Sequence, residues 1–200
     1  MKITIFGATG SVGPYLIDEA LRQGHSVVAI SRHDHRVDSR SQVEWGSVDY
    51  NSIEGIASVL SDSDAAVISL GDFDVVTPTE KITQAMNQAG VRRLEILTGF
   101  GTSPTSRKQL GLGMRLIMTA MRPMLRTKEK QDQIVRNSEL NFTIVQPPTL
   151  TDGSATRTYR YGDYKGKTIT GHISRADLSE FMVTNLTQNR YAQSSVYIQE

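Results

Sequence analysis

Three glycines near the amino terminus, Gly7, Gly10 and Gly13, follow an apolar stretch and come directly before a helical pattern. A strand, a glycine-rich turn and a helix in this order can hold a pyrophosphate, because glycine allows a sharp turn and a close approach of the backbone. The helix N-terminus then presents free N–H groups and a partial positive charge to the phosphates. A glycine-rich turn without a ligand is the alternative interpretation. We expect a dinucleotide to contact Gly7, Thr9, Gly10, Ser11, Val12 and Gly13.

The second apolar stretch, Ser26–Ile30, runs into polar residues that bear on the choice of dinucleotide. At this point an acidic residue binds the ribose 2′-hydroxyl of NAD, whereas an arginine accommodates the 2′-phosphate of NADP. The residues nearest the ribose are Ser31 and Arg32, and a guanidinium can bind a phosphate through two hydrogen bonds. The sequence therefore favours NADP, with NADPH preferred over NADH. Asp34 leaves NAD open as the alternative.

Stretches of strand length alternate with helical patterns along the rest of the chain. Further strands are expected at Val43–Trp45, Ala65–Ser69, Leu94–Thr98, Asn141–Gln146 and Ser195–Ile198. Helices are expected at Tyr15–Arg22, from Ser52 to Leu60, from Thr77 to Gly90, from about Leu110 to Ser138 with an interruption at Pro123, and from Ser174 to about Leu186. The segments expected to form loops are Gly99–Ser106 and Thr151–Gly166.

This alternation predicts an α/β protein with a doubly wound parallel sheet, covered by helices on both faces through right-handed crossovers. With the glycine loop after the first strand, we expect a Rossmann fold with the core strand order 3-2-1-4-5-6. The ligand crevice should lie at the carboxyl ends of the first and fourth strands. No change in composition divides the chain, so residues 1–200 are expected to form one domain.

Composition and charge narrow the classes of function. The formal net charge of +1 gives no reason to expect nucleic acid or a membrane as a partner. The chain has no cysteine, and His33 and His35 have no third ligand nearby, so no metal site is expected. Neither a signal peptide nor a membrane span is evident, which favours a cytoplasmic protein. We expect a monomer or a homodimer that acts on a small molecule.

Four motifs give the chain a resemblance to the atypical short-chain dehydrogenase/reductase superfamily. They are Gly7–Gly13, Ile144–Pro148, Thr151–Gly153 and Ile173–Leu178. Within the superfamily the chain most resembles the NAD(P)H-binding group that includes NmrA-like proteins and biliverdin reductase B, also called flavin reductase. The resemblance extends over essentially all 200 residues, and none of the motifs fixes a substrate.

The resemblance implies further contacts with the cofactor. Arg32 matches the arginine that follows the second strand in NADPH-binding members, and Gly46–Asp49 matches a Gly-Asp-x-x-Asp segment beside the adenine, with Ser47 in place of the first acid. On this basis the adenine side would be formed by Ser47 and Val48. The surroundings of the nicotinamide and its ribose would be formed by Ser69, Leu70, Gly71, Thr98, Gly99, Pro147 and Pro148.

Typical short-chain dehydrogenases carry a Tyr-x-x-x-Lys pair on the helix after the fifth strand, where the phenol exchanges a proton with the substrate oxygen. By family spacing Lys128 occupies the lysine position, and Met124, which cannot transfer a proton, occupies the tyrosine position. The string Tyr161–Lys165 falls in a predicted loop and is interpreted as a coincidence. The candidate catalytic residues are therefore Lys128 and two hydroxyls that would orient an acceptor, Thr98 and Ser103.

The predicted late loop holds Tyr159, Tyr161 and Tyr164, which would either stack on a flat ring or remain ordinary surface aromatics. Ser174 and Asp177 have the spacing of a helix cap, a structural role that we favour over a catalytic one.

Three functions compete. The leading one is an NADPH-dependent reductase of a flavin, quinone or similar flat acceptor, because such ring systems can take their proton from solvent. The second is an NAD(P)-sensing, NmrA-like regulator without turnover. The third, epimerase or dehydratase chemistry on a nucleotide sugar, is weakened because only about fifty residues follow the sixth strand.

Overall fold

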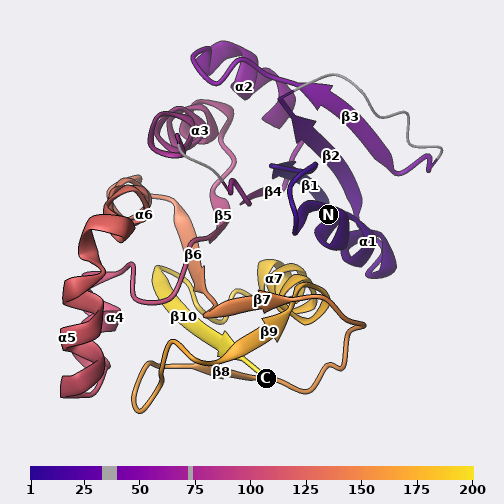
Figure 1. The fold of residues 1–200 in the computed structure, drawn as a ribbon. Helices are drawn as coiled ribbons and strands as arrows, with labels where there is room; N and C mark the ends of the chain where they lie inside the picture. The colour runs from indigo at the N-terminus through magenta and orange to yellow at the C-terminus, as the bar shows by residue number, and fades with distance from the viewer. Residues whose placement is uncertain (33–39, 72–73) are drawn as a thin grey trace.

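The computed structural model describes residues 1–32, 40–71 and 74–200 (Figure 1). Its strands are β1 (Lys2–Phe6), β2 (Ser26–Ser31), β3 (Val43–Ser47), β4 (Ala65–Ile68), β5 (Arg93–Leu97), β6 (Asn141–Gln146), β7 (Thr149–Thr151), β8 (Arg160–Gly162), β9 (His172–Ser174) and β10 (Ser194–Gln199). Its helices are α1 (Gly13–Arg22), α2 (Ile53–Leu60), α3 (Val76–Ala89), α4 (Pro104–Gln109), α5 (Leu112–Ala120), α6 (Arg122–Arg136) and α7 (Arg175–Gln188).

The main sheet has the strand order β3-β2-β1-β4-β5-β6-β10-β8, which confirms the predicted core order 3-2-1-4-5-6. Neighbouring strands are parallel from β3 to β10, and β8 pairs with β10 in the antiparallel direction. A separate parallel pair joins β7 to β9. All strands of the main sheet except β8 therefore end at one edge, where the predicted ligand crevice should lie.

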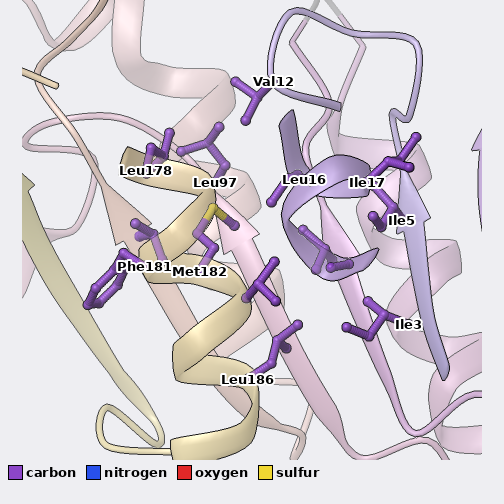
Figure 2. Packing of buried hydrophobic residues seen from close by; sticks show 14 of the residues in the cluster. Ile3, Ile5, Val12, Leu16, Ile17, Leu97, Leu178, Phe181, Met182 and Leu186 are labelled. Carbon is purple, nitrogen blue, oxygen red and sulfur yellow. The ribbon is translucent and has the colours of Figure 1, made fainter. Parts of the chain in front are cut away.

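Helices cover both faces of the sheet, as Figure 1 shows. On β1, Ile3 and Ile5 pack into the core below α1 and α7, whereas the adjacent Phe6 packs into the core below α2, α3 and α6. Successive side chains of a strand point to opposite faces, so a strand covered on both sides must be apolar throughout. Figure 2 shows the first core, where Leu16 of α1 lies close to Met182 of α7.

The segment between β5 and β6 differs from the prediction. The expected interruption at Pro123 is present, because α5 ends at Ala120 and α6 begins at Arg122 with the proline in its first turn. The expected loop Gly99–Ser106 is only partly a loop, since Pro104 starts the short helix α4.

After β6, the expected loop Thr151–Gly166 also contains a strand. This strand is β8, whose three residues are too few to leave a periodic pattern in the sequence.

Candidate functional site

A cleft of about 970 Å³ lies at the carboxyl edge of the parallel strands. Its walls include residues at or just beyond the ends of β1, β2, β4 and β5, as the predicted strand order requires. Twelve of the predicted cofactor or catalytic residues line it. They are Gly7, Thr9, Gly10, Ser11, Val12, Ser31, Arg32, Ser69, Leu70, Gly71, Thr98 and Lys128.

The glycine loop packs too tightly to accept side chains at two of its three glycines. A Cβ on Gly7, which has a φ of +90°, would lie 2.3 Å from the carbonyl oxygen of Ser69. A Cβ on Gly13 would lie 2.2 Å from the carbonyl oxygen of Ala8. Gly10 is less confined, since its Cβ would lie 3.1 Å from the carbonyl oxygen of Gly7. Gly7 and Gly13 therefore shape the loop, and Gly10 leaves its wall of the cleft bare of a side chain.

The first turn of α1 presents N–H groups that no side chain caps. The residue before the helix is Val12, which has no capping atom, and the first turn contains no acidic residue. Gly10, Ser11 and Val12 all line the cleft. An uncapped N-terminus with its partial positive charge beside a bare glycine wall fits a pyrophosphate.

At the end of β2 the cleft is lined by Ser31, Arg32 and Tyr50. Burial raises the pKa of the Tyr50 phenol to about 12, against the opposing effect of the Arg32 charge, so this phenol keeps its proton at neutral pH. The centroid of the Tyr50 ring lies 6.3 Å from the centroid of the Phe6 ring. A cation and a flat aromatic wall suit the phosphorylated ribose of a nucleotide. Asp34, the residue that left NAD open, lies outside the described residues.

At the ends of β4 and β5 the cleft is lined by Ser69, Leu70, Thr98 and Lys128. The Lys128 ammonium donates a hydrogen bond of 2.9 Å to the carbonyl oxygen of Leu70, which ties α6 to the segment after β4. A cation from α6 and a hydroxyl from the segment just after β5 thus line the same cleft.

The Thr98 hydroxyl is held by a buried network behind it. The amide nitrogen of Gln146 lies 3.3 Å from the Thr98 hydroxyl and 2.9 Å from that of Ser103, and it also donates to Thr102. The amide oxygen of Gln146 accepts from the buried phenol of Tyr164. Because Gln146 is fully buried, this network fixes the loop after β5 from inside the protein.

Ser103 does not lie where we expected it. Its side chain is 0% exposed and is not among the residues that line the cleft. Its hydroxyl contacts the carboxylate of Asp132 and accepts a hydrogen bond of 3.0 Å from Arg136. The ion pair between Arg136 and Asp132 turns this hydroxyl toward the interior, so Ser103 has no surface with which to orient an acceptor.

The other expected residues outside the lining are Gly13, Ser47, Val48, Gly99, Pro147 and Pro148. Gly13 lies under the glycine loop, as its contact with Ala8 shows. Ser47 ends β3 and pairs in register with Ser31, one strand further from the cleft. The Pro147 carbonyl accepts a hydrogen bond from the Phe100 N–H, which holds the two loops together. The structure therefore does not place these six residues in the wall of the cleft.

The phenols of the late loop lie apart from the cleft. Tyr164 is 1% exposed, and Tyr161 packs its ring 5.1 Å from that of Phe181. Tyr159 donates to Glu180 and packs on the same ring of Phe181. Among the described residues that line the cleft, Tyr50 is the one phenol, and it lies at the end where β2 stops.

Met124, which family spacing assigns to the tyrosine position, is 80% exposed and is not among the residues that line the cleft. Lys128 follows it by one turn of α6 and does line the cleft. Of the two residues that the family spacing singled out, the structure brings only the lysine to the site.

Ser174 and Asp177 have the structural role that we favoured. The Ser174 hydroxyl accepts from the Asp177 N–H at 3.0 Å and so caps α7. The Asp177 carboxylate also accepts the N–H groups of Thr156 and Arg157, at 3.1 and 2.7 Å. Burial by itself raises the pKa of Asp177, but these hydrogen bonds lower it overall. The cap therefore also anchors the segment before β8.

Several lining residues were missed by the sequence analysis. Tyr50 directly follows the segment Gly46–Asp49 that the resemblance placed beside the adenine, and this neighbourhood was a usable signal. Asp74, Val75 and Pro78 line the cleft at the start of α3, where no motif marks them.

Comparison with known proteins agrees with this geometry. A family model described as NAD(P)H-binding matches residues 7–189. A 4-hydroxy-tetrahydrodipicolinate reductase from Natronomonas pharaonis is 32% identical over 100 residues, which are 50% of this chain and 36% of that protein. The chain thus spans about a third of the length of that reductase.

Solved structures share the fold over the whole chain. A candidate NADH-flavin reductase from Streptococcus pneumoniae has a TM-score of 0.79 at 22% identity, and the match covers 100% of this chain and 99% of that one. A short-chain dehydrogenase/reductase from Veillonella parvula, solved in complex with NADP, has a TM-score of 0.81 at 14% identity and coverages of 100% and 94%. At these identities the likeness establishes the Rossmann-like architecture.

Proposed function

Since this chain belongs to the NAD(P)H-binding family, we propose that it is an NADPH-dependent reductase that passes hydride to a flat acceptor such as a flavin or a quinone. One observation carries the proposal. At one part of the cleft, the N-terminus of α1 has no side-chain cap and lies at the glycine loop. The cleft is also lined by Thr98 and Lys128, and none of its described lining residues places a phenol beside these two. This arrangement favours hydride transfer to an acceptor that needs no tyrosine acid.

The preference for NADPH rests on Arg32. Arg32 directly follows β2 and lines the cleft at the point where a dinucleotide places its adenine ribose. A guanidinium there favours the 2′-phosphate of NADPH over the hydroxyl of NADH. Tyr50, protonated on the same wall, can donate to the ribose or flank the adenine.

NADPH, when bound, supplies the hydride, and the protein's own residues position the acceptor. Thr98 offers a hydroxyl that Gln146 and Thr102 hold in place. Lys128 offers a cation, which favours an acceptor with an anionic or carbonyl oxygen. Fixing the acceptor over the cofactor supplies most of the rate enhancement expected of such a site, and solvent supplies the proton.

The comparisons support this choice among family chemistries. One structural neighbour carries the description of a candidate NADH-flavin reductase, and another binds NADP. The exposed Met124 at the tyrosine position argues against alcohol oxidation, which needs a group to exchange the proton.

The test is NADPH oxidation, followed by absorbance, with FMN, riboflavin, biliverdin and a simple quinone as acceptors. We expect turnover with at least one of these acceptors and none with secondary alcohols and NADP in the reverse direction. Alcohol oxidation at a comparable rate would contradict the proposal. Tight NADPH binding without turnover on any acceptor would instead favour the cofactor-sensing alternative.

A further inference from the structure

Helix α5 has apolar side chains on both of its sides. Met118 is fully buried and faces the interior with Phe100 and Leu110. On the other side, Leu112 and Leu116 are 75% and 65% exposed, and Ile117 is 47% exposed. A surface helix normally presents polar residues to water, so an exposed apolar stripe on the outside of α5 needs another explanation.

At the start of α6, Met124 is also exposed, at 80%. In Figure 1, α5 forms the outer edge of the molecule, beside α4 and α6. We define the α5–α6 face as the exposed residues Leu112, Arg115, Leu116, Ile117, Arg122, Arg126 and Lys130. Lys128, which lines the cleft, follows Met124 by one helical turn.

The α5–α6 face lies within a strongly basic part of the chain. Residues 107–130 contain seven of the 22 Lys and Arg residues but one of the 21 Asp and Glu residues. That segment has a formal charge of +6 in a chain whose total is +1, so the remainder of the protein is net acidic. Its one acid, Glu129, is paired with Arg107 and Arg122. Arg115, Arg126 and Lys130 form no ion pair with any of the residues that the structure describes.

We propose that the α5–α6 face docks on the surface of an anionic lipid bilayer. Aliphatic side chains flanked by Lys and Arg match the boundary between acyl chains and negatively charged headgroups, and each cation near such a surface adds to binding. Contact is peripheral, because no helix within residues 1–32, 40–71 and 74–200 is long and apolar enough to cross a membrane.

A second copy of the chain is a poorer occupant of this face. A twofold dimer would bring the same patch of both subunits together, and with it two sets of cations around one apolar centre. Like charges so placed repel, whereas anionic headgroups neutralise them. Charge complementarity therefore favours an anionic lipid surface over a second copy of the chain as the occupant of the α5–α6 face.

The test is co-sedimentation with vesicles of phosphatidylcholine alone and of phosphatidylcholine with phosphatidylglycerol in equal parts. We expect binding to the anionic vesicles only, weakening with added salt because exposed charges are screened. Arg115→Glu with Arg126→Glu should lower the binding constant by about 30-fold or more. Leu116→Ser with Ile117→Ser should lower it as well, and thermal unfolding should show that both variants remain folded.

A matched control reverses two exposed charges elsewhere. Arg92 precedes β5 and Arg190 follows α7, so both lie at the opposite edge of the sheet. Arg92→Glu with Arg190→Glu changes the net charge equally and should retain vesicle binding.

Three results would overturn the proposal. One is no binding to anionic vesicles at low salt. Another is binding that Leu116→Ser with Ile117→Ser leaves unchanged, since adsorption would then be electrostatic alone. The third is a dimer in analytical ultracentrifugation that the same serine variant dissociates, because the occupant of the face would then be a second copy.

Discussion

Replacing Gly13 with alanine should destabilise the protein, whereas the same change at Gly10 should spare the fold and weaken NADPH binding. The two glycines belong to one loop and differ in their surroundings. A Cβ on Gly13 would lie 2.2 Å from the Ala8 carbonyl oxygen and 2.7 Å from that of Gly7. A Cβ on Gly10 would have its shortest contact at 3.1 Å, which a small adjustment relieves.

The loss of stability in Gly13→Ala follows from the shift that α1 would have to make. The new methyl group starts about 1 Å inside ordinary contact with backbone that cannot swing away, so α1 must shift against the core that holds Leu16 and Ile17. Overpacking of this kind costs about 2–3 kcal/mol. For a chain of 200 residues that corresponds to a fall in Tm of roughly 4–12 °C.

In Gly10→Ala the expected loss is in the affinity for NADPH. Its methyl group would project at the wall that we assign to the pyrophosphate and prevent the close approach of backbone N–H groups. Each charge-assisted hydrogen bond lost is worth about 1.5–3 kcal/mol, so affinity for NADPH should fall by at least about tenfold. Stability should change by less than about 1 kcal/mol.

The assay pairs thermal unfolding with calorimetric titration of NADPH. Gly113→Ala is the matched control, because its Cβ would meet nothing within 4 Å on the exposed helix α5 and alanine favours a helix. A Tm of Gly13→Ala equal to that of this control would refute the steric argument. An unchanged NADPH affinity in Gly10→Ala would refute the assignment of the loop to the phosphates.

Other predictions follow from the same structure. Arg32→Ala should weaken NADPH by about 1.5–3 kcal/mol in calorimetry and leave NADH nearly unaffected, and equal losses would contradict its role at the 2′-phosphate. Thr98→Val should slow NADPH oxidation, whereas Ser103→Ala should chiefly lower Tm, because Ser103 is buried against Arg136 and Asp132; the reverse pattern would show that Ser103 reaches the acceptor. Asp177→Asn should cost about 2–4 kcal/mol at neutral pH in urea unfolding, because it weakens several bonds to one carboxylate. The folded pKa of Asp177 is lowered, so its contribution is present above its ordinary value of 3.8 and is lost as pH falls below it. A difference between wild type and variant that persists at low pH would contradict this.

The sheet and the place of the cleft were predictable because their signals are local and repeated. Each central strand is apolar at consecutive positions, as at Ile5 and Phe6, and this pattern requires cover on both faces. Gly7 and Gly13 mark the first turn, since no other residue fits their contacts. With the crossover rule, these signals fix the strand order and bring the ends of β1 and β4 together.

The position of Ser103 was not predictable in the same way. A serine after a strand has the same sequence signature whether it faces a cleft or the interior. What turns it inward is the pair of Asp132 and Arg136, about thirty residues away in sequence on α6. The strand β8 is also invisible locally, because its three residues are defined by pairing with β10.

The exposed face of α5 is a third feature that could not be predicted from the sequence. Met118 and Leu116 lie two residues apart and are equally apolar, yet one is buried and the other is 65% exposed. Periodicity cannot tell the two sides of such a helix apart. Likewise, the total charge of +1, from which we expected no membrane partner, conceals a basic segment balanced by acids elsewhere.

The most direct test of the proposed reductase activity is a single-turnover measurement of hydride transfer. The protein is loaded with NADPH, or with NADPH deuterated at the reactive carbon, and mixed rapidly with FMN or a simple quinone while NADPH absorbance is recorded. We predict acceptor-dependent oxidation that is slower for the deuterated cofactor in one of its two stereochemical forms. Bound NADPH that stays reduced in the presence of every acceptor would contradict the account.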